Sequence, residues 1–138
     1  MPTIKGVVET VLYTRNMRLA RYFFESVMGL TPHTADHRFT AYALEWNMLL
    51  LFADGETSET VELPGDMGTI PPHDGSGRQH IAFAIAADAL DDWAKHLQAN
   101  DIAIEGQTRW PKGAVSLYFR DPDGHLLELV TPGIWPNY

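Results

Sequence analysis

The stretch "VVETVLYTRNMRLARYFFESVMGL", residues 7–30, decides the fold because it joins two different periodicities. Its first part, Val7–Thr14, is rich in β-branched and aromatic residues, which predicts a strand. From Asn16, a residue type that caps helices, apolar side chains recur at helical spacing until Gly29. A strand followed directly by a helix is therefore expected.

The second half of the chain repeats this order. The first half is completed by two expected strands, Phe39–Leu44 and Met48–Phe52. The corresponding segments of the second half are a strand at His80–Ala86, a helix capped by Asp88 and ending near Asn100, and strands at Val115–Phe119 and Leu126–Val130.

Fixed spacings support a duplication. Glu9 and His80 are 71 residues apart, and the expected helix caps Asn16 and Asp88 are 72 apart. We expect an α+β fold of two tandem βαββ(β) modules that form a curved mixed sheet around a central cavity, with a short strand such as Ile102–Ile104 completing each module. The alternative is two unrelated α/β stretches of similar length. The expected organisation is a single domain, 1–138, with modules at about 5–53 and 80–132 and a loop at 54–79.

Composition excludes several classes of function. The 138 residues carry a net charge of -8 and no Lys/Arg cluster, which argues against nucleic-acid or anionic-membrane partners. There is no cysteine, so any metal must be held by His, Asp or Glu. No run of 18 apolar residues and no signal peptide is present, so a cytoplasmic location is expected.

Three ionisable side chains fall on mainly apolar strand faces: Glu9, His80 and Glu128. Burying an unpaired charge is costly, so such a carboxylate needs a cation or an exposed strand edge. If the strands line one concavity, two carboxylates and one imidazole would form a site for a divalent cation. Taken singly, each has a plainer interpretation, as a solvated glutamate or a core histidine bonded to a carbonyl.

Other candidates surround this predicted site. His73 lies in the long acidic loop 54–79, where it could close over the pocket as an acid or base, or remain an exposed loop side chain. Tyr118, Arg120 and Trp110 are candidates for substrate binding, although Arg120 could instead hold the "DPDG" turn that follows it.

The segments "VVETVLYTRNMRLARYFFESVMGL", "HIAFAI" and "LYFRDPDGHLLELVTP" resemble the vicinal oxygen chelate superfamily, which includes glyoxalase I, fosfomycin-resistance enzymes, extradiol dioxygenases and bleomycin-resistance proteins. The resemblance implies paired βαβββ modules around a metal. It places the metal ligands on Glu9, His80 and Glu128. The catalytic candidates are Glu128 and, from its place in the loop, His73. The fourth family position falls near Leu50, which cannot coordinate.

The resemblance and the ligand types together favour a lyase or isomerase that chelates a small oxygenated substrate through a divalent ion, Zn, Ni, Mn or Fe. Two alternatives stay open. One is an extradiol-type dioxygenase, and the other is a metal-free small-molecule binding protein of the bleomycin-resistance kind. The expected partners are a small-molecule substrate and, by resemblance, a second copy in a homodimer.

Overall fold

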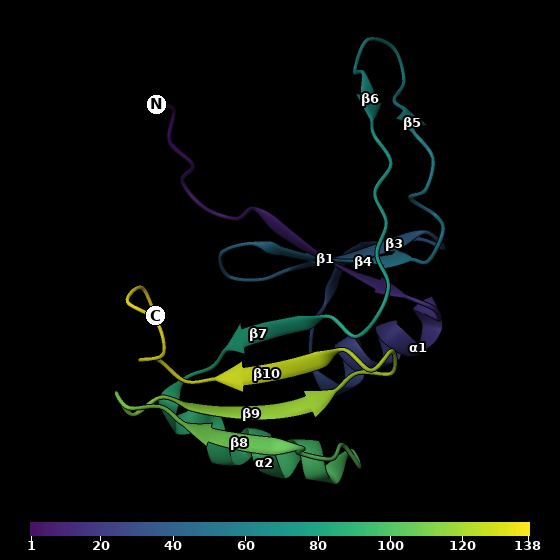
Figure 1. Cartoon of the computed structure of the whole chain (residues 1–138). Helices are drawn as coiled ribbons and strands as arrows, with labels where there is room; N and C mark the ends of the chain where they lie inside the picture. The colour runs from purple at the N-terminus through teal and green to yellow at the C-terminus, as the bar shows by residue number, and fades with distance from the viewer. The chain divides into compact units, whose positions relative to one another are not determined.

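The computed structural model describes every residue from Met1 to Tyr138, in two compact units, Met1–Ser76 and Gly77–Tyr138. Each unit contains one four-stranded sheet (Figure 1). The elements of the first unit are β1 (Glu9–Thr14), α1 (Met17–Tyr22), the π-helical turn η1 (Phe23–Val27), β2 (Pro32–Ala35), β3 (Phe39–Ala43), β4 (Met48–Ala53), β5 (Val61–Glu62) and β6 (Thr69–Ile70). Those of the second are β7 (His80–Ala84), the 3-10 turn η2 (Ala87–Ala89), α2 (Leu90–Ala99), β8 (Gly106–Arg109), β9 (Val115–Arg120) and β10 (Leu126–Val130).

The two sheets have the same topology. Their strand orders are β1-β4-β3-β2 and β7-β10-β9-β8. In each sheet the first and last long strands of the module pair in parallel and the remaining pairs are antiparallel. A parallel pair needs a crossover connection, and each helix lies in that connection. The predicted α+β class and the duplicated module are confirmed.

Each module has the additional strand, but its predicted position was wrong. Residues 102–104 are irregular, and the strand that completes the second sheet is β8, at Gly106–Arg109. Its counterpart in the first sheet is β2, at Pro32–Ala35. Both are short, polar edge strands, so the apolar alternation that reveals inner strands is missing from them.

The two helices begin differently. The side-chain oxygen of Asn16 accepts a hydrogen bond from the Leu19 N–H at 3.1 Å, so the predicted cap of α1 is confirmed. Asp88 does not cap α2, because the chain first makes the 3-10 turn η2 and α2 begins at Leu90. Gly29 ends the first helical segment with φ +71°, a conformation that favours glycine.

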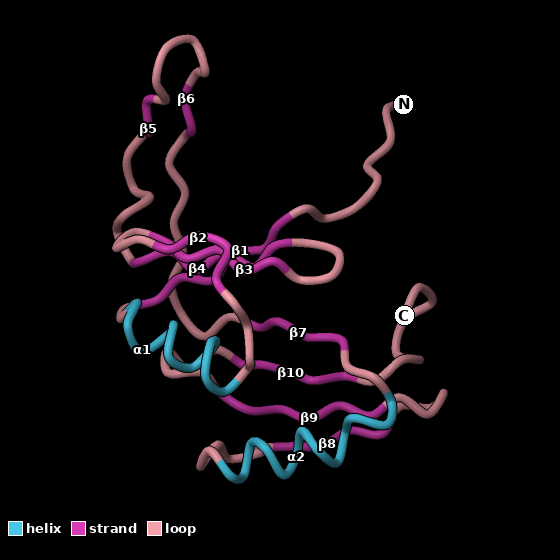
Figure 2. The backbone as a smooth tube through the Cα atoms, turned by 180° about the vertical axis from the view of Figure 1, so that it is seen from behind, coloured by secondary structure: helices cyan, strands magenta, loops and turns pink.

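Each helix covers one face of its sheet (Figure 2). In the first unit Phe24 and Tyr42 are fully buried, with ring centroids 6.1 Å apart, beside Leu49 and Leu51. In the second unit Leu97 of α2 is buried, as are Leu117, Phe119, Leu127 and Leu129 of the sheet. The opposite face of each sheet is therefore left to carry the candidate site residues.

The long loop of the first unit contains its own hairpin. β5 and β6 pair antiparallel, and this hairpin extends away from the sheet of the same unit (Figures 1 and 2). Its base is closed where Thr57 and His73 exchange two hydrogen bonds, of 2.9 and 2.6 Å. None of the helices has the length and apolar character needed to cross a membrane.

Candidate metal centre

Strand register places several candidates in adjacent rows on one face of the second sheet. The row of register partners next to the β9–β10 turn consists of His80, Leu126 and Arg120. The next row contains Glu128 and, directly opposite it on β9, Tyr118. Side chains directly across or diagonal on one face are within reach of each other, so His80 and Glu128 can meet.

They do meet. His80 Nε2 lies 3.2 Å from Glu128 Oε2. The glutamate is only 4% exposed, whereas about half of the imidazole is accessible to solvent. The buried carboxylate thus has its open side toward the accessible face of the histidine ring.

A chain of two hydrogen bonds orients the Glu128 carboxylate. The hydroxyl of fully buried Ser116 donates to Glu128 Oε1, and the indole Nε1–H of Trp110 donates to Ser116 Oγ at 2.8 Å. The indole N–H can only donate, so it directs the serine proton toward the carboxylate. This chain orients Glu128 and leaves Oε2 for His80. Trp110, expected to contact substrate, therefore contacts the serine that orients Glu128.

The other histidine nitrogen fixes the tautomer of His80. Nδ1 lies 2.8 Å from the Leu126 carbonyl oxygen, which can only accept, so Nδ1 carries a proton. In the neutral ring, Nε2 then presents a lone pair to a carboxylate oxygen. Two acceptors facing each other need a proton or a cation between them.

A divalent ion fits this arrangement. Two ligand atoms about 2.1 Å from one ion and about 90–109° apart lie roughly 3.0–3.4 Å from each other. The 3.2 Å between His80 Nε2 and Glu128 Oε2 falls in that range. A ligand histidine with its second nitrogen bonded to a carbonyl, and a ligand carboxylate that is itself hydrogen-bonded, are regular features of protein metal sites.

Glu9 belongs to the first unit, at the exposed start of the edge strand β1. No hydrogen bond or ion pair holds its carboxylate. The register of Val11 with Leu50 in the first sheet repeats that of Ala82 with Glu128 in the second, so Leu50 is the counterpart of Glu128. The participation of Glu9 with the other two ligands stays a prediction.

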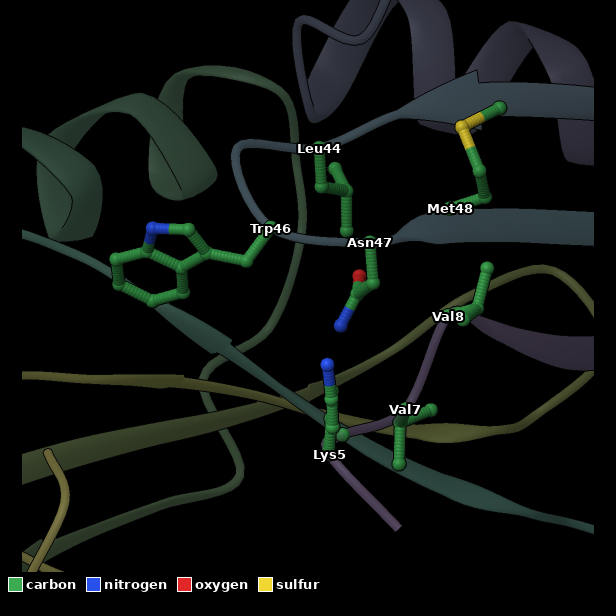
Figure 3. A pocket seen from close by; sticks show the side chains of 8 residues that line it. Lys5, Val7, Val8, Leu44, Trp46, Asn47 and Met48 are labelled. Atoms are coloured by element: carbon green, nitrogen blue, oxygen red, sulfur yellow. The ribbon is translucent and has the colours of Figure 1, made fainter.

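A hollow of about 630 Å³ lies beside Glu9 in the first unit (Figure 3). Met48, the register partner of Glu9, is one of its lining residues. The N-terminal segment 5–8 and the β3–β4 connection form its walls, which are mainly apolar apart from Lys5 and Asn47. Trp46, an exposed side chain, is among the residues that line it.

His73 is tied to the same face of the first sheet, but in another row. Its Nδ1 lies 2.6 Å from the Tyr13 hydroxyl, and its ring packs edge-on against Phe52 at 5.0 Å. Burial, and then the negative charge of Asp74, raise the pKa of Tyr13, so the phenol stays protonated. Tyr13 is four residues from Glu9, about 13 Å along a strand. His73 is thus half-buried and held in place, and its catalytic role stays a prediction.

The predicted substrate residues Tyr118 and Arg120 have different surroundings. Tyr118 is half-buried and faces Gly106 across the sheet, where no side chain competes for space. Arg120 donates to Glu105 at 3.0 Å and to the Gly124 carbonyl at 3.1 Å. Those contacts are the turn-holding role that the sequence offered as the alternative.

A second group of potential ligands lies in the turn itself. Ligand atoms of Asp121, Asp123 and His125 all lie within 4.8 Å of one another, a group that could hold a metal ion. In the structure Asp121 accepts from the backbone N–H groups of Asp123 and His125 and binds His125 Nδ1 at 2.7 Å. These bonds stabilise the turn. His125 is only 2% exposed, and the Asp at the start of the turn is the sequence signal for this arrangement.

Comparison with known proteins agrees with this architecture. Residues 6–129 match the model of the Glyoxalase/Bleomycin resistance protein/Dioxygenase superfamily. The chain belongs to this superfamily. The recognition made from the sequence segments is confirmed.

Individual members of the superfamily are similar to different extents. The solved structure of a lactoylglutathione lyase from Agrobacterium tumefaciens is 30% identical with a TM-score of 0.84, covering 97% of this chain and 98% of that one. Glutathione transferase FosA of Serratia marcescens is 29% identical over 107 residues, 78% of this chain and 67% of the relative. Metallothiol transferase FosB of Staphylococcus saprophyticus is 43% identical over 53 residues, 38% of this chain but only 35% of the relative's length.

Proposed function

We propose that the protein is a divalent-metal enzyme of this superfamily and that His80 and Glu128 hold the ion, with Glu9 as the third protein ligand. The observation that carries the proposal is the 3.2 Å approach of His80 Nε2 to the buried Glu128 Oε2, with the Leu126 carbonyl fixing the proton on Nδ1. Zn, Ni, Mn or Fe would suit one imidazole and two carboxylates.

Bound there, the ion would supply Lewis-acid polarisation to two neighbouring oxygens of a small carbonyl or hydroxy-acid substrate. The residues of the chain supply the rest. Ser116 and Trp110 keep Glu128 in one orientation, with Oε2 directed at the ion. Tyr118, beside Glu128 on the same face, would orient the substrate.

The proposed reaction is that of a lyase or isomerase. The lactoylglutathione lyase that aligns with almost the whole chain supports this class. A direct assay incubates the metal-loaded protein with methylglyoxal and glutathione and follows S-lactoylglutathione by chromatography. Product formation that depends on added metal supports the assignment, and its absence removes this particular substrate.

A second candidate is transfer of a thiol to a small electrophile. The local similarity to FosB and the longer one to FosA favour it. Fosfomycin is a suitable probe because fosfomycin-resistance enzymes are one branch of the superfamily that the sequence resembles. Mass spectrometry would detect an adduct with the summed mass of glutathione and fosfomycin, and this product would favour transfer over isomerisation.

The metal itself is tested by replacing Glu128. Glu128→Gln keeps an oxygen that can accept from Ser116 but removes the charge, so the ion content should fall from about one per chain to near zero. Glu105→Gln, which alters an exposed glutamate of the same unit, is the matched control and should retain the ion. Metal content is measured by elemental analysis after purification without added metal.

Other results of that analysis would change the assignment. Equal ion content in both variants would refute His80 and Glu128 as the site. Iron together with O₂ consumption on catechols would favour the dioxygenase alternative. Ligand binding that survives removal of all three proposed ligands would favour a metal-free binding protein.

A further inference from the structure

Arg78 lies two residues before His80, just ahead of the start of β7. The Leu126 N–H donates to the Gln79 carbonyl at 2.8 Å, so the β7–β10 ladder continues back to residue 79. Strand alternation then places Arg78 on the same side of the sheet as His80.

The stem of Arg78 is supported by the β9–β10 turn. A Cβ atom added at Gly124 would lie 3.1 Å from Arg78 Cδ and 3.3 Å from its Cγ. Gly124 also has φ +82°, so glycine is favoured here for two reasons. The arginine stem therefore lies close to the backbone of the β9–β10 turn, at this end of the sheet.

The guanidinium of Arg78 has no anionic partner, unlike its neighbours. It makes no hydrogen bond or ion pair in the structure. Arg120, the other arginine at this end, forms an ion pair with Glu105 and donates to the Gly124 carbonyl. The carboxylate of Asp121 is paired with His125. Arg109 lies opposite Val115 in the β8–β9 register, at the other end of β9.

We propose that Arg78 binds an oxyanion group, carboxylate or phosphate, on a substrate whose other oxygens reach the His80–Glu128 centre. The planar guanidinium fork matches both kinds of oxyanion. In a chain with a net charge of -8, an unpaired cation beside the site would also offset the general repulsion of an anionic substrate. This inference rests on the proposed function and narrows its substrate class to small oxygenated acids with a second anionic group.

The test compares three ligands of the manganese-loaded protein by calorimetric titration. Glycolate has one carboxylate and a neighbouring hydroxyl, tartronate adds a second carboxylate, and 2-phosphoglycolate carries a phosphate on its hydroxyl oxygen. We expect the wild type to bind at least one of the two larger ligands more tightly than glycolate, by about tenfold or more. The ligand that binds more tightly than glycolate shows whether Arg78 binds a carboxylate or a phosphate.

Arg78→Gln should abolish that gain while leaving the metal content and the glycolate affinity unchanged. Gln retains part of the stem over Gly124, and Arg109→Gln, a matched control at the far end of β9, should keep the gain. A gain that persists in Arg78→Gln, or no gain in a wild type that binds manganese and glycolate, would overturn the inference. Failure to bind manganese at all would instead overturn the proposed function beneath it.

Discussion

Ser116 offers the sharpest test of how the chain prepares its metal centre. The side chain is fully buried, donates to Glu128 and accepts from Trp110. Ser116→Ala removes the donor that orients the carboxylate while leaving His80 and Glu128 in place. Loss of such a supporting hydrogen bond lowers metal affinity by about 10–100-fold in protein sites, equivalent to about 1.4–2.7 kcal/mol.

The same substitution should also lower the free energy of unfolding by about 2 kcal/mol, because a buried carboxylate loses a charge-assisted hydrogen bond. Trp110→Phe removes only the outer donor and should give a smaller loss of metal affinity. Ser58→Ala is the matched control, since this hydroxyl donates to the Gly55 carbonyl in an exposed turn of the other unit. Metal affinity is measured by competition with a chromogenic chelator, and stability by urea unfolding.

The two measurements separate orientation of the ligand from simple support of the fold. Reduced metal affinity in Ser116→Ala, a smaller reduction in Trp110→Phe and none in Ser58→Ala would confirm the chain of donors. A Ser116→Ala protein that is destabilised but binds metal as tightly as the wild type would refute the argument that Ser116 prepares Glu128.

Three further predictions concern the rest of the molecule. Burial, and then the charge of Glu25, raise the pKa of Tyr42, so the wild type should lose stability as the pH rises above about 10, where the phenol of the unfolded chain ionises. Tyr42→Phe should lose less stability over that rise, while its free energy of unfolding at neutral pH should be about 1 kcal/mol lower because the hydrogen bond to Glu25 is gone. Urea unfolding at neutral pH and above pH about 10 checks both expectations. Asp121→Ala removes three hydrogen bonds from a buried turn and should cost about 3 kcal/mol in thermal or urea unfolding, and a cost below 1 kcal/mol would contradict the turn-stabilising role. Tyr13→Phe should release His73 and make loop 54–79 more susceptible to limited proteolysis, and unchanged cleavage rates would show that the loop is held elsewhere.

Local pattern was sufficient where the signal lay within a few residues. Strand alternation placed His80 and Glu128 each on a defined face of its own strand, and the helix cap at Asn16 was read from residue type. The 71-residue spacing between Glu9 and His80 implied a repeat, and the two sheets have the same strand order. These features follow from backbone geometry, which is the same wherever the segment lies in the fold.

Other features depended on partners distant in the sequence. The edge strands β2 and β8 are defined by the neighbours they pair with, and their own residues are mostly polar. Nothing local marks Ser116 as the donor to Glu128, Glu105 as the partner of Arg120, or Arg78 as an arginine without an anionic partner. The sequence by itself therefore determined the duplicated α+β modules and the types of the candidate ligands, because periodicity and residue chemistry are local. Only the tertiary structure decided which charges are neutralised and which side chains orient Glu128, because hydrogen bonds and ion pairs depend on distances between segments far apart in the chain.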